Sequence, residues 1–482
     1  MRPTDYNFPF DEYRQVQLDA LEWASQADRQ VLMLSAPPGV GKSLIGATWG
    51  KMFGGSKGFI LTKTLSLLQQ YETQLGIPGV RGAANFNCEV VSGLNCEDAA
   101  AGCPFRPTDE RSCPYLRQKA EGLRAPQAVA AYAFALWNPV QRDYLVCDEG
   151  HSLLDILTDF ESISIPLDLN PPRERERLPT WAELTLPKVV EAKPSLDLPK
   201  AVARWQRTIR ALERLKKLDD YPHVLVTNNK SLVLKPVWPR NPRRLWGSSR
   251  ALLMSATLFS GGLMADLLNL APGNWDYLEM PSPFEVGRRP LYIKPVVKLN
   301  AQSGAAAYDA MARNIAWLMK SYPGEKGLLH VSSYKQVKML KYALDDLPVV
   351  APLLVHQGEK GLARDKLFRE FRERPGPLWL LSPSAREGED FPYDQARVNV
   401  LVKIPYPDLG DPVLAARRED GALGKTYYAA VTCANLAQAY GRGMRAEDDF
   451  GATWVLDSNI YNLLRWSREH LPQYLLEAVQ RV

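Results

Sequence analysis

The feature that most constrains this chain is a short loop rich in proline and glycine, set between a buried strand and a helix. Val31–Leu34 is an apolar run typical of a buried strand, residues 36–41 form the loop, and a helix-compatible segment begins at Lys42. This order places backbone N–H groups and the positive end of a helix dipole around an anion. It predicts a phosphate-binding loop in an α/β sheet, and therefore a nucleotide site.

The residue types in the loop fit this chemistry. Gly39 and Gly41 allow the backbone to close around phosphate oxygens. We expect Lys42 to reach the β- and γ-phosphates and Ser43 to coordinate Mg²⁺. The first loop position is Ala36, where the strict pattern has glycine. The loop therefore predicts binding of a nucleotide together with Mg²⁺.

Two acidic residues end a second predicted strand, at 144–147. Asp148 and Glu149 follow this strand and should lie at the sheet edge that carries the phosphate loop. There Asp148 can hold the Mg²⁺ shell and Glu149 can orient the attacking water. Paired acids at a strand end often form only a solvated turn. The Asp-Glu-x-His order, completed by His151, favours the catalytic interpretation.

Gln17 lies a short helix before the first strand. A glutamine so placed hydrogen-bonds adenine in many nucleic-acid-dependent ATPases, while an exposed glutamine on a surface helix is the alternative. The neighbouring phosphate loop favours the first interpretation.

Bulk composition describes an ordinary globular protein that divides into two or three domains. The chain has 482 residues, of which 46% are hydrophobic and 23% charged. A formal charge of +5 is too small to identify a partner by itself. The N-terminus does not resemble a signal peptide, and no apolar run is long enough for a membrane span. We expect a cytoplasmic protein with reduced thiols.

Four of the six cysteines are concentrated in one stretch. Cys88, Cys96, Cys103 and Cys113 are separated by seven, six and nine residues. This spacing differs from the short pairs of common zinc modules. It is more compatible with four thiolates on an iron–sulfur cluster, although zinc or no metal stays open from spacing alone.

Residues 152–245 interrupt the α/β pattern and are interpreted as an insertion in the first α/β domain. Asn170–Pro194 is rich in proline and charge and reads as an irregular linker. Leu198–Leu218 predicts an amphipathic helix whose arginines form either a solvated face or a nucleic-acid contact. His223–Pro236 predicts a hairpin.

A second α/β unit starts near residue 288, and two of its segments contain candidate residues for the nucleotide site. Gln438, Arg442 and Arg445 follow helical spacing, so the two arginines can stabilise charge on a γ-phosphate across an interdomain cleft. Gly388 and Asp390 follow a predicted strand, where the glycine allows close backbone approach and the acid can relay the nucleotide state.

These segments together resemble a superfamily-two helicase, and specifically the XPD/DinG-like iron–sulfur helicases. The match runs in the right order from about residue 13. Segments similar to helicase motifs I, II, III and VI are APPGVGKS at 36–43, DEGH at 148–151, SAT at 255–257 and QAYGRGMR at 438–445. Segments similar to elements specific to the iron–sulfur members are Arg81–Cys88, Cys113–Tyr115 with Tyr132, Glu387–Pro392 and Lys403–Pro412.

The resemblance implies an α/β fold with two RecA-like parallel-sheet motor domains, an iron–sulfur domain and a small arch-like insertion in the first motor. The expected boundaries are 1–80, 136–151 and 246–285 for motor domain 1, 81–135 for the iron–sulfur domain, 152–245 for the insertion and 286–482 for motor domain 2.

It also implies an ATP-dependent DNA helicase that moves 5′→3′ on single-stranded DNA and unwinds duplex. The implied cofactors are ATP, Mg²⁺ and a [4Fe-4S] cluster on the four cysteines. The expected partners are single-stranded and forked duplex DNA, not a membrane, and we expect a monomer. A translocase or recruiting module without productive unwinding, or an RNA helicase, are the alternatives.

Overall fold

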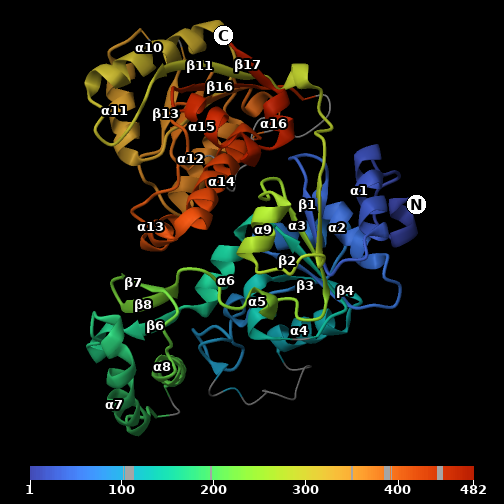
Figure 1. Cartoon of the computed structure of the whole chain (residues 1–482), viewed down its shortest axis with the longest axis vertical. Coiled ribbons are helices and arrows are strands. Elements are labelled where there is room, and N and C mark those ends of the chain that lie inside the picture. Colours follow the sequence, from blue (N-terminus) through green and yellow to red (C-terminus); the bar gives the residue numbers. More distant parts are fainter. Residues whose placement is uncertain are drawn as a thin grey trace.

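The computed structural model describes residues 1–100, 103, 113–139, 141–195, 198–348, 351–384, 391, 393–441 and 449–482. Two α/β bodies, each built on a seven-stranded sheet, lie one above the other in Figure 1, with a smaller unit beside the first. None of the helices in the described part of the chain combines the length and hydrophobicity that a bilayer crossing requires.

The first sheet has the strand order β10-β1-β9-β5-β2-β4-β3, and all its pairs are parallel. Its strands are β1 (Val31–Ser35), β2 (Gly58–Thr62), β3 (Gly79–Val80), β4 (Gln127–Ala131), β5 (Tyr144–Asp148), β9 (Arg250–Ser255) and β10 (Trp275–Glu279). Its helices are α1 (Gln15–Gln26), α2 (Lys42–Lys51), α3 (Leu65–Leu75), α4 (Pro114–Arg124), α5 (Tyr132–Trp137), α6 (Leu153–Glu161) and α9 (Gly261–Leu267).

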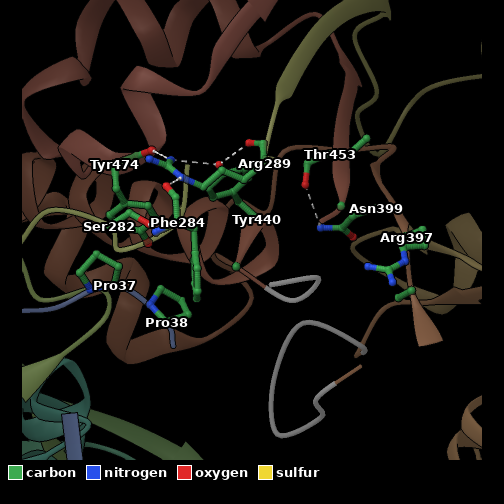
Figure 2. Close-up of a pocket in the computed structure, with 14 residues that line it drawn as sticks. Pro37, Pro38, Ser282, Phe284, Arg289, Arg397, Asn399, Tyr440, Thr453 and Tyr474 are labelled. Carbon is green, nitrogen blue, oxygen red and sulfur yellow. Dashed lines mark hydrogen bonds between the residues drawn. The ribbon is translucent and has the colours of Figure 1, made fainter. Parts of the chain in front are cut away.

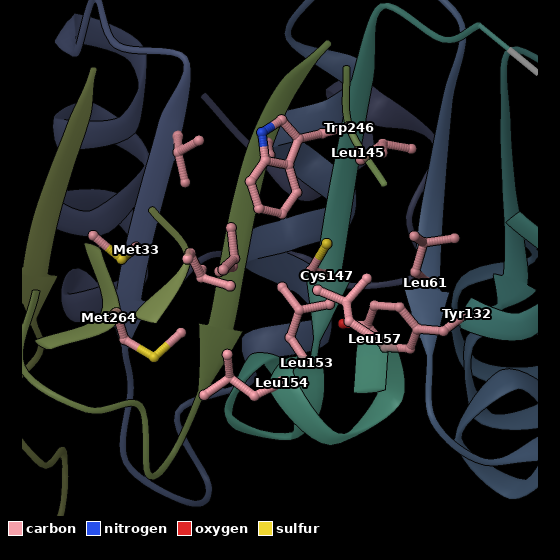
Figure 3. Close-up of a cluster of buried hydrophobic side chains, with 14 of the residues drawn as sticks. Met33, Leu61, Tyr132, Leu145, Cys147, Leu153, Leu154, Leu157, Trp246 and Met264 are labelled. Atoms are coloured by element: carbon pink, nitrogen blue, oxygen red, sulfur yellow. The ribbon is translucent and has the colours of Figure 1, made fainter. Parts of the chain in front are cut away.

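Helices cover both faces of this sheet, and the strands are therefore apolar on both sides. In β1, Val31 and Met33 belong to one core while Leu32 and Leu34 belong to the other. Figure 3 shows the first of these cores. The continuous apolar runs read from the sequence are thus explained, because parallel strands bury both of their faces.

One expected boundary is wrong. Strand β4 pairs with β2 and β3 inside the first sheet, so residues 127–135 belong to that body and not to a separate cysteine-bearing domain. The run Gln-Ala-Val-Ala-Ala is short and made mostly of small residues, which gives little strand signal.

The insertion has its own core. Its antiparallel sheet, in the order β6-β8-β7, confirms the predicted hairpin. The elements are β6 (Ile163–Pro166), α7 (Leu178–Glu191), α8 (Pro199–Lys216), β7 (His223–Thr227) and β8 (Ser231–Pro236). Helix α7 lies where an irregular linker was expected, and that prediction is wrong. Pro179 is tolerated in its first turn and Pro187 stands inside it, while Leu178 and Ala182 are anchored in the insertion core.

The second sheet is also fully parallel, in the order β13-β14-β12-β15-β16-β11-β17. Its strands are β11 (Leu291–Val297), β12 (Gly327–His330), β13 (Leu353–Val355), β14 (Trp379–Ser382), β15 (Val398–Leu401), β16 (Ala452–Asp457) and β17 (Val479–Arg481). Its helices are α10 (Ala305–Ser321), α11 (Tyr334–Asp345), α12 (Leu362–Glu373), α13 (Pro412–Glu419), α14 (Gly421–Tyr440), α15 (Ile460–Trp466) and α16 (Gln473–Glu477).

A buried arginine anchors the second body to the first. Arg417 of α13 is 2% exposed. It donates to Asp155 Oδ1 and Thr158 Oγ1 of α6, each at 2.7 Å, and to the Val237 carbonyl after β8, also at 2.7 Å. In Figure 1, α13 is the part of the second body nearest to the insertion. This contact, which we call the Arg417 anchor, fixes one end of the interface between the bodies.

Candidate nucleotide site

The phosphate loop joins β1 to α2 in a conformation that requires glycine. Gly39 and Gly41 have φ of 79° and 78°. A Cβ on Gly41 would lie 2.4 Å from Gln17 Nε2. Helix α2 begins at Lys42, whose Nζ reaches back 3.3 Å to the Ala36 carbonyl. The loop thus leads directly into the N-terminus of α2, where backbone N–H groups can bind an anion.

Gln17 supports this loop from behind. It is buried, its Nε2 donates to the Val40 carbonyl at 2.8 Å, and its Oε1 accepts from the Arg14 backbone N–H at 2.9 Å. The Arg14 side chain also donates to the Gly39 carbonyl, at 2.5 Å. Both residues therefore fix the loop backbone, and a contact between Gln17 and adenine stays a prediction.

Asp148 lies at the end of β5 and is held at three points. Its Oδ2 accepts from the Tyr71 hydroxyl at 2.8 Å, and its Oδ1 accepts from the Glu149 backbone N–H at 2.9 Å. Its backbone carbonyl accepts from the Tyr132 hydroxyl at 2.8 Å. Burial, and next the Glu149 carboxylate, raise the pKa of Asp148 to about 6, while the Lys42 ammonium acts in the opposite direction. A divalent cation would offset this cost, so the buried carboxylate fits the Mg²⁺ role.

A hydrogen-bonded chain crosses from this acid box to the second body. Glu149 has a left-handed backbone, with φ of 54°, and its carboxylate lies 3.2 Å from His151 Nδ1. The same nitrogen is 2.7 Å from Ser255 Oγ at the end of β9. Gln438 of α14 reaches His151 Nε2 at 3.2 Å and Thr257 Oγ1 at 3.3 Å. The structure therefore brings Gln438 to the site that the sequence assigned to it.

The end of α14 lies against the phosphate loop. A Cβ on Gly441 would meet Pro38 Cγ at 2.6 Å. Arg442 and Arg445 follow directly, but they lie outside the described residues, as do Gly388 and Asp390. The described geometry thus puts Gly441, the residue before Arg442 in the sequence, next to the loop.

Beside this contact lies a small pocket between the loop and the second body (Figure 2). Pro37 and Pro38 form one wall. Arg289 forms part of the other, donating from Nε to the Phe284 carbonyl at 2.9 Å and accepting at its own carbonyl from the Tyr440 hydroxyl at 2.6 Å. The two bodies therefore share a crevice at the phosphate loop.

The four cysteines of the predicted cluster are all described, and they are partly gathered. An antiparallel bridge between Asn87 and Asn95 brings the chain of Cys88 beside that of Cys96. The thiols of Cys96 and Cys113 are 3.8 Å apart and buried, and Cys88 Sγ accepts a backbone N–H. No disulfide forms, and no group of three or more potential metal ligands assembles within the described residues.

Three arginines of α8 form contacts with other parts of the same chain. Arg204 pairs with Asp168, Arg207 lies 3.5 Å from Glu97 of the cysteine-bearing segment, and Arg214 donates to the Ser162 carbonyl at 3.0 Å. These contacts favour the structural interpretation for much of this face.

Two parallel α/β sheets that meet at a phosphate loop and a strand-end acid pair define a two-domain nucleotide-dependent enzyme. Residues 315–478 match the helicase C-terminal domain family. No match is found among curated proteins. The domain match supports an ATP-dependent helicase.

Solved structures of helicases share the fold of this chain. A structure described as an XPD helicase superposes with a TM-score of 0.65 and 16% identity, over 98% of this chain and 100% of that one. An apo XPD structure gives 0.60 and 15%, and S. tokodaii Xpd4 gives 0.58 and 15%, each over 97% of this chain and 100% of its own. At such identities the likeness concerns the fold, which is that of two RecA-like helicase domains. With the helicase domain match, it supports an ATP-dependent helicase.

Tyr71, Tyr132 and Arg14 were not predicted as site residues. A tyrosine on an amphipathic helix reads as core, and the partner of Tyr71 is set by the neighbouring positions of β2 and β5 in the sheet. Arg14 and Gln17 contact the Gly39 and Val40 carbonyls. These contacts depend on the folded shape of the loop, which the sequence does not specify.

Proposed function

We propose that this protein is an ATP-dependent DNA helicase that moves 5′→3′ along single-stranded DNA. The observation that carries the ATP-driven part of the proposal is a contact between the two bodies, in which Gln438 of the second bonds to His151 of the acid box in the first. A nucleotide bound there would touch both bodies, so its hydrolysis would change how they are held together.

The residue roles follow from position. Lys42 and the loop backbone would bind the β- and γ-phosphates, and Ser43 and Asp148 would hold Mg²⁺. Glu149 would orient the attacking water, with His151 fixing its carboxylate. Arg442 and Arg445 would meet the γ-phosphate from the second body, which the position of Gly441 supports. Gly388 and Asp390 would report the nucleotide state to the DNA path.

We further propose that Cys88, Cys96, Cys103 and Cys113 hold a [4Fe-4S] cluster with a structural role beside the DNA. The donor set fits, because none of the four cysteines is in a disulfide and one pair of thiols is in contact at 3.8 Å. A backbone N–H on Cys88 Sγ suits a thiolate ligand. Anaerobic absorption near 400 nm with counted iron and sulfide tests this. A colourless protein with stoichiometric zinc would contradict it.

A forked duplex tests the function directly. With ATP and a 5′ single-stranded tail, we expect release of the labelled strand, and little release from a fork with only a 3′ tail. Hydrolysis of ATP without strand release would favour a translocase or recruiting module instead. Equal activity on an RNA tail would assign an RNA or mixed substrate.

A further inference from the structure

We propose that Tyr71 is a positioning residue of the nucleotide site, whose phenol orients the Asp148 carboxylate for binding Mg²⁺. The inference rests on the proposed nucleotide function and adds to it a residue from a different element, helix α3.

The phenol contacts one of the two expected metal ligands. Its hydroxyl donates to Asp148 Oδ2 at 2.8 Å, and both groups are buried. The hydroxyl therefore joins helix α3 to the carboxylate at the end of β5. An ionised carboxylate has about four lone-pair sites, so accepting from Tyr71 leaves room for a metal-bound water.

The other oxygens of Asp148 are also hydrogen-bonded, so the phenol adds the contact that holds Oδ2. Glu149 N–H binds Oδ1, and Tyr132 binds the backbone carbonyl from the opposite side. Figure 3 shows Tyr132 beside β5. With the Tyr71 hydroxyl removed, Oδ2 would lose its hydrogen-bond donor and the carboxylate would be held through Oδ1 alone.

A purely structural role is the competing explanation, because the Tyr71 ring is part of a core cluster and is 1% exposed. Tyr71→Phe separates the two roles, since phenylalanine keeps the ring in place and loses only the hydroxyl. Tyr144 provides a matched control. It is 2% exposed and belongs to the same core, and its hydroxyl accepts from Gln127 Nε2, which also bonds to the Ala47 carbonyl.

The experiment measures Mn²⁺ binding by electron paramagnetic resonance in the presence of ADP, next to binding of ADP without metal. Partners that orient metal ligands typically contribute about 10- to 100-fold to metal affinity, so we expect Tyr71→Phe to weaken Mn²⁺ binding by at least about 10-fold. Metal-free ADP binding should change by less than about twofold, because it depends on the loop. Tyr144→Phe should leave both values within about twofold of the wild type.

A spectroscopic readout keeps the Tyr71 hydroxyl in place and therefore does not require the Tyr71→Phe variant to fold. With 3-fluorotyrosine at position 71, the ¹⁹F signal should shift when Mn²⁺ is replaced by diamagnetic Mg²⁺ or when Mg²⁺ is added to the ADP complex. The same label at position 144 should shift far less on Mg²⁺ addition. A Tyr71→Phe protein that binds Mn²⁺ like Tyr144→Phe, or a label at 71 silent to Mg²⁺, overturns the inference alone. Failure of the wild type to bind ADP with metal would overturn the proposed function itself.

Discussion

The two seven-stranded sheets share an architecture but use their carboxyl edges differently. In the first sheet, Asp148 is held by hydroxyls from two other places in the chain and by the next backbone N–H, so the edge is arranged before any ligand arrives. In the second sheet, buried His356 bonds to Ser382 and Ser384, at 3.0 and 3.2 Å, within its own body. Among the described residues, the second body contributes the end of helix α14 to the nucleotide site.

This difference suggests that the two bodies have separate roles in the nucleotide cycle. The first sheet is expected to determine whether a nucleotide binds, and the second whether the bound nucleotide is hydrolysed. Changes in the first sheet should therefore affect binding and turnover together, while changes in the second should affect turnover alone.

Lys42→Ala should have the largest effect. It removes the cation expected on the phosphates, and we expect DNA-stimulated ATP hydrolysis to fall by at least about 100-fold, with weaker nucleotide binding. Steady-state hydrolysis and equilibrium binding of a fluorescent ATP analogue measure the two quantities. Lys57→Ala, an exposed lysine before β2, serves as the control. Near-normal turnover in Lys42→Ala would mean that the site is assigned to the wrong loop.

Arg417→Ala should weaken the connection between the bodies. Hydrogen bonds to charged groups contribute about 1.5–3 kcal/mol, so we expect the free energy of unfolding to drop by about 2–3 kcal/mol. Denaturant titration measures this. Arg418→Ala, whose side chain is half exposed and pairs with exposed Glu419, should change it by less than about 0.5 kcal/mol. Equal losses in both variants would show that the Arg417 anchor adds no stability.

Gln438→Ala should separate binding from turnover. It removes the amide that joins α14 to His151 and Thr257, and we expect hydrolysis to fall by about 10-fold while nucleotide affinity stays within about twofold. Asn435→Ala, one turn earlier, removes an amide that bonds to Pro405 inside the second body. If Gln438→Ala instead raises the dissociation constant for nucleotide by the same factor, the proposed division between the sheets is wrong.

Arg207→Ala should have the smallest effect. Its pair with Glu97 joins α8 to the cysteine-bearing segment, but both side chains are about half exposed, at 51% and 55%. Such pairs contribute about 0.2–1 kcal/mol, so thermal unfolding should shift by only a few degrees. A larger loss would mean that the insertion and this segment depend on each other to fold.

The sequence predicted the site best where one short segment contains the whole signal. The loop at 36–43 and the pair Asp148 and Glu149 follow from local order, and the position of Gln438 followed from the motif resemblance. The apolar strands β1 and β5 were read correctly, because burial on both faces leaves a continuous apolar run.

What could not be predicted depends on distant neighbours. Strand β4 is made mostly of small residues and is recognisable only beside β2 and β3. Helix α7 forms in spite of Pro187 because its apolar side packs on the insertion core. The contact between Tyr71 and Asp148 spans 77 positions in the chain and exists only because β2 and β5 are adjacent.

The placement of the Arg417 anchor has a mechanical consequence. The anchor lies just before α14, whereas the nucleotide contacts lie at the other end of that helix. Helix α14 has 20 residues and is therefore about 30 Å long. If the anchor holds while the crevice opens, the helix swings as a lever with its fulcrum at Arg417. A rotation of a few degrees there becomes a displacement of ångströms at Gln438, enough to break a single amide contact and release the second body from the acid box.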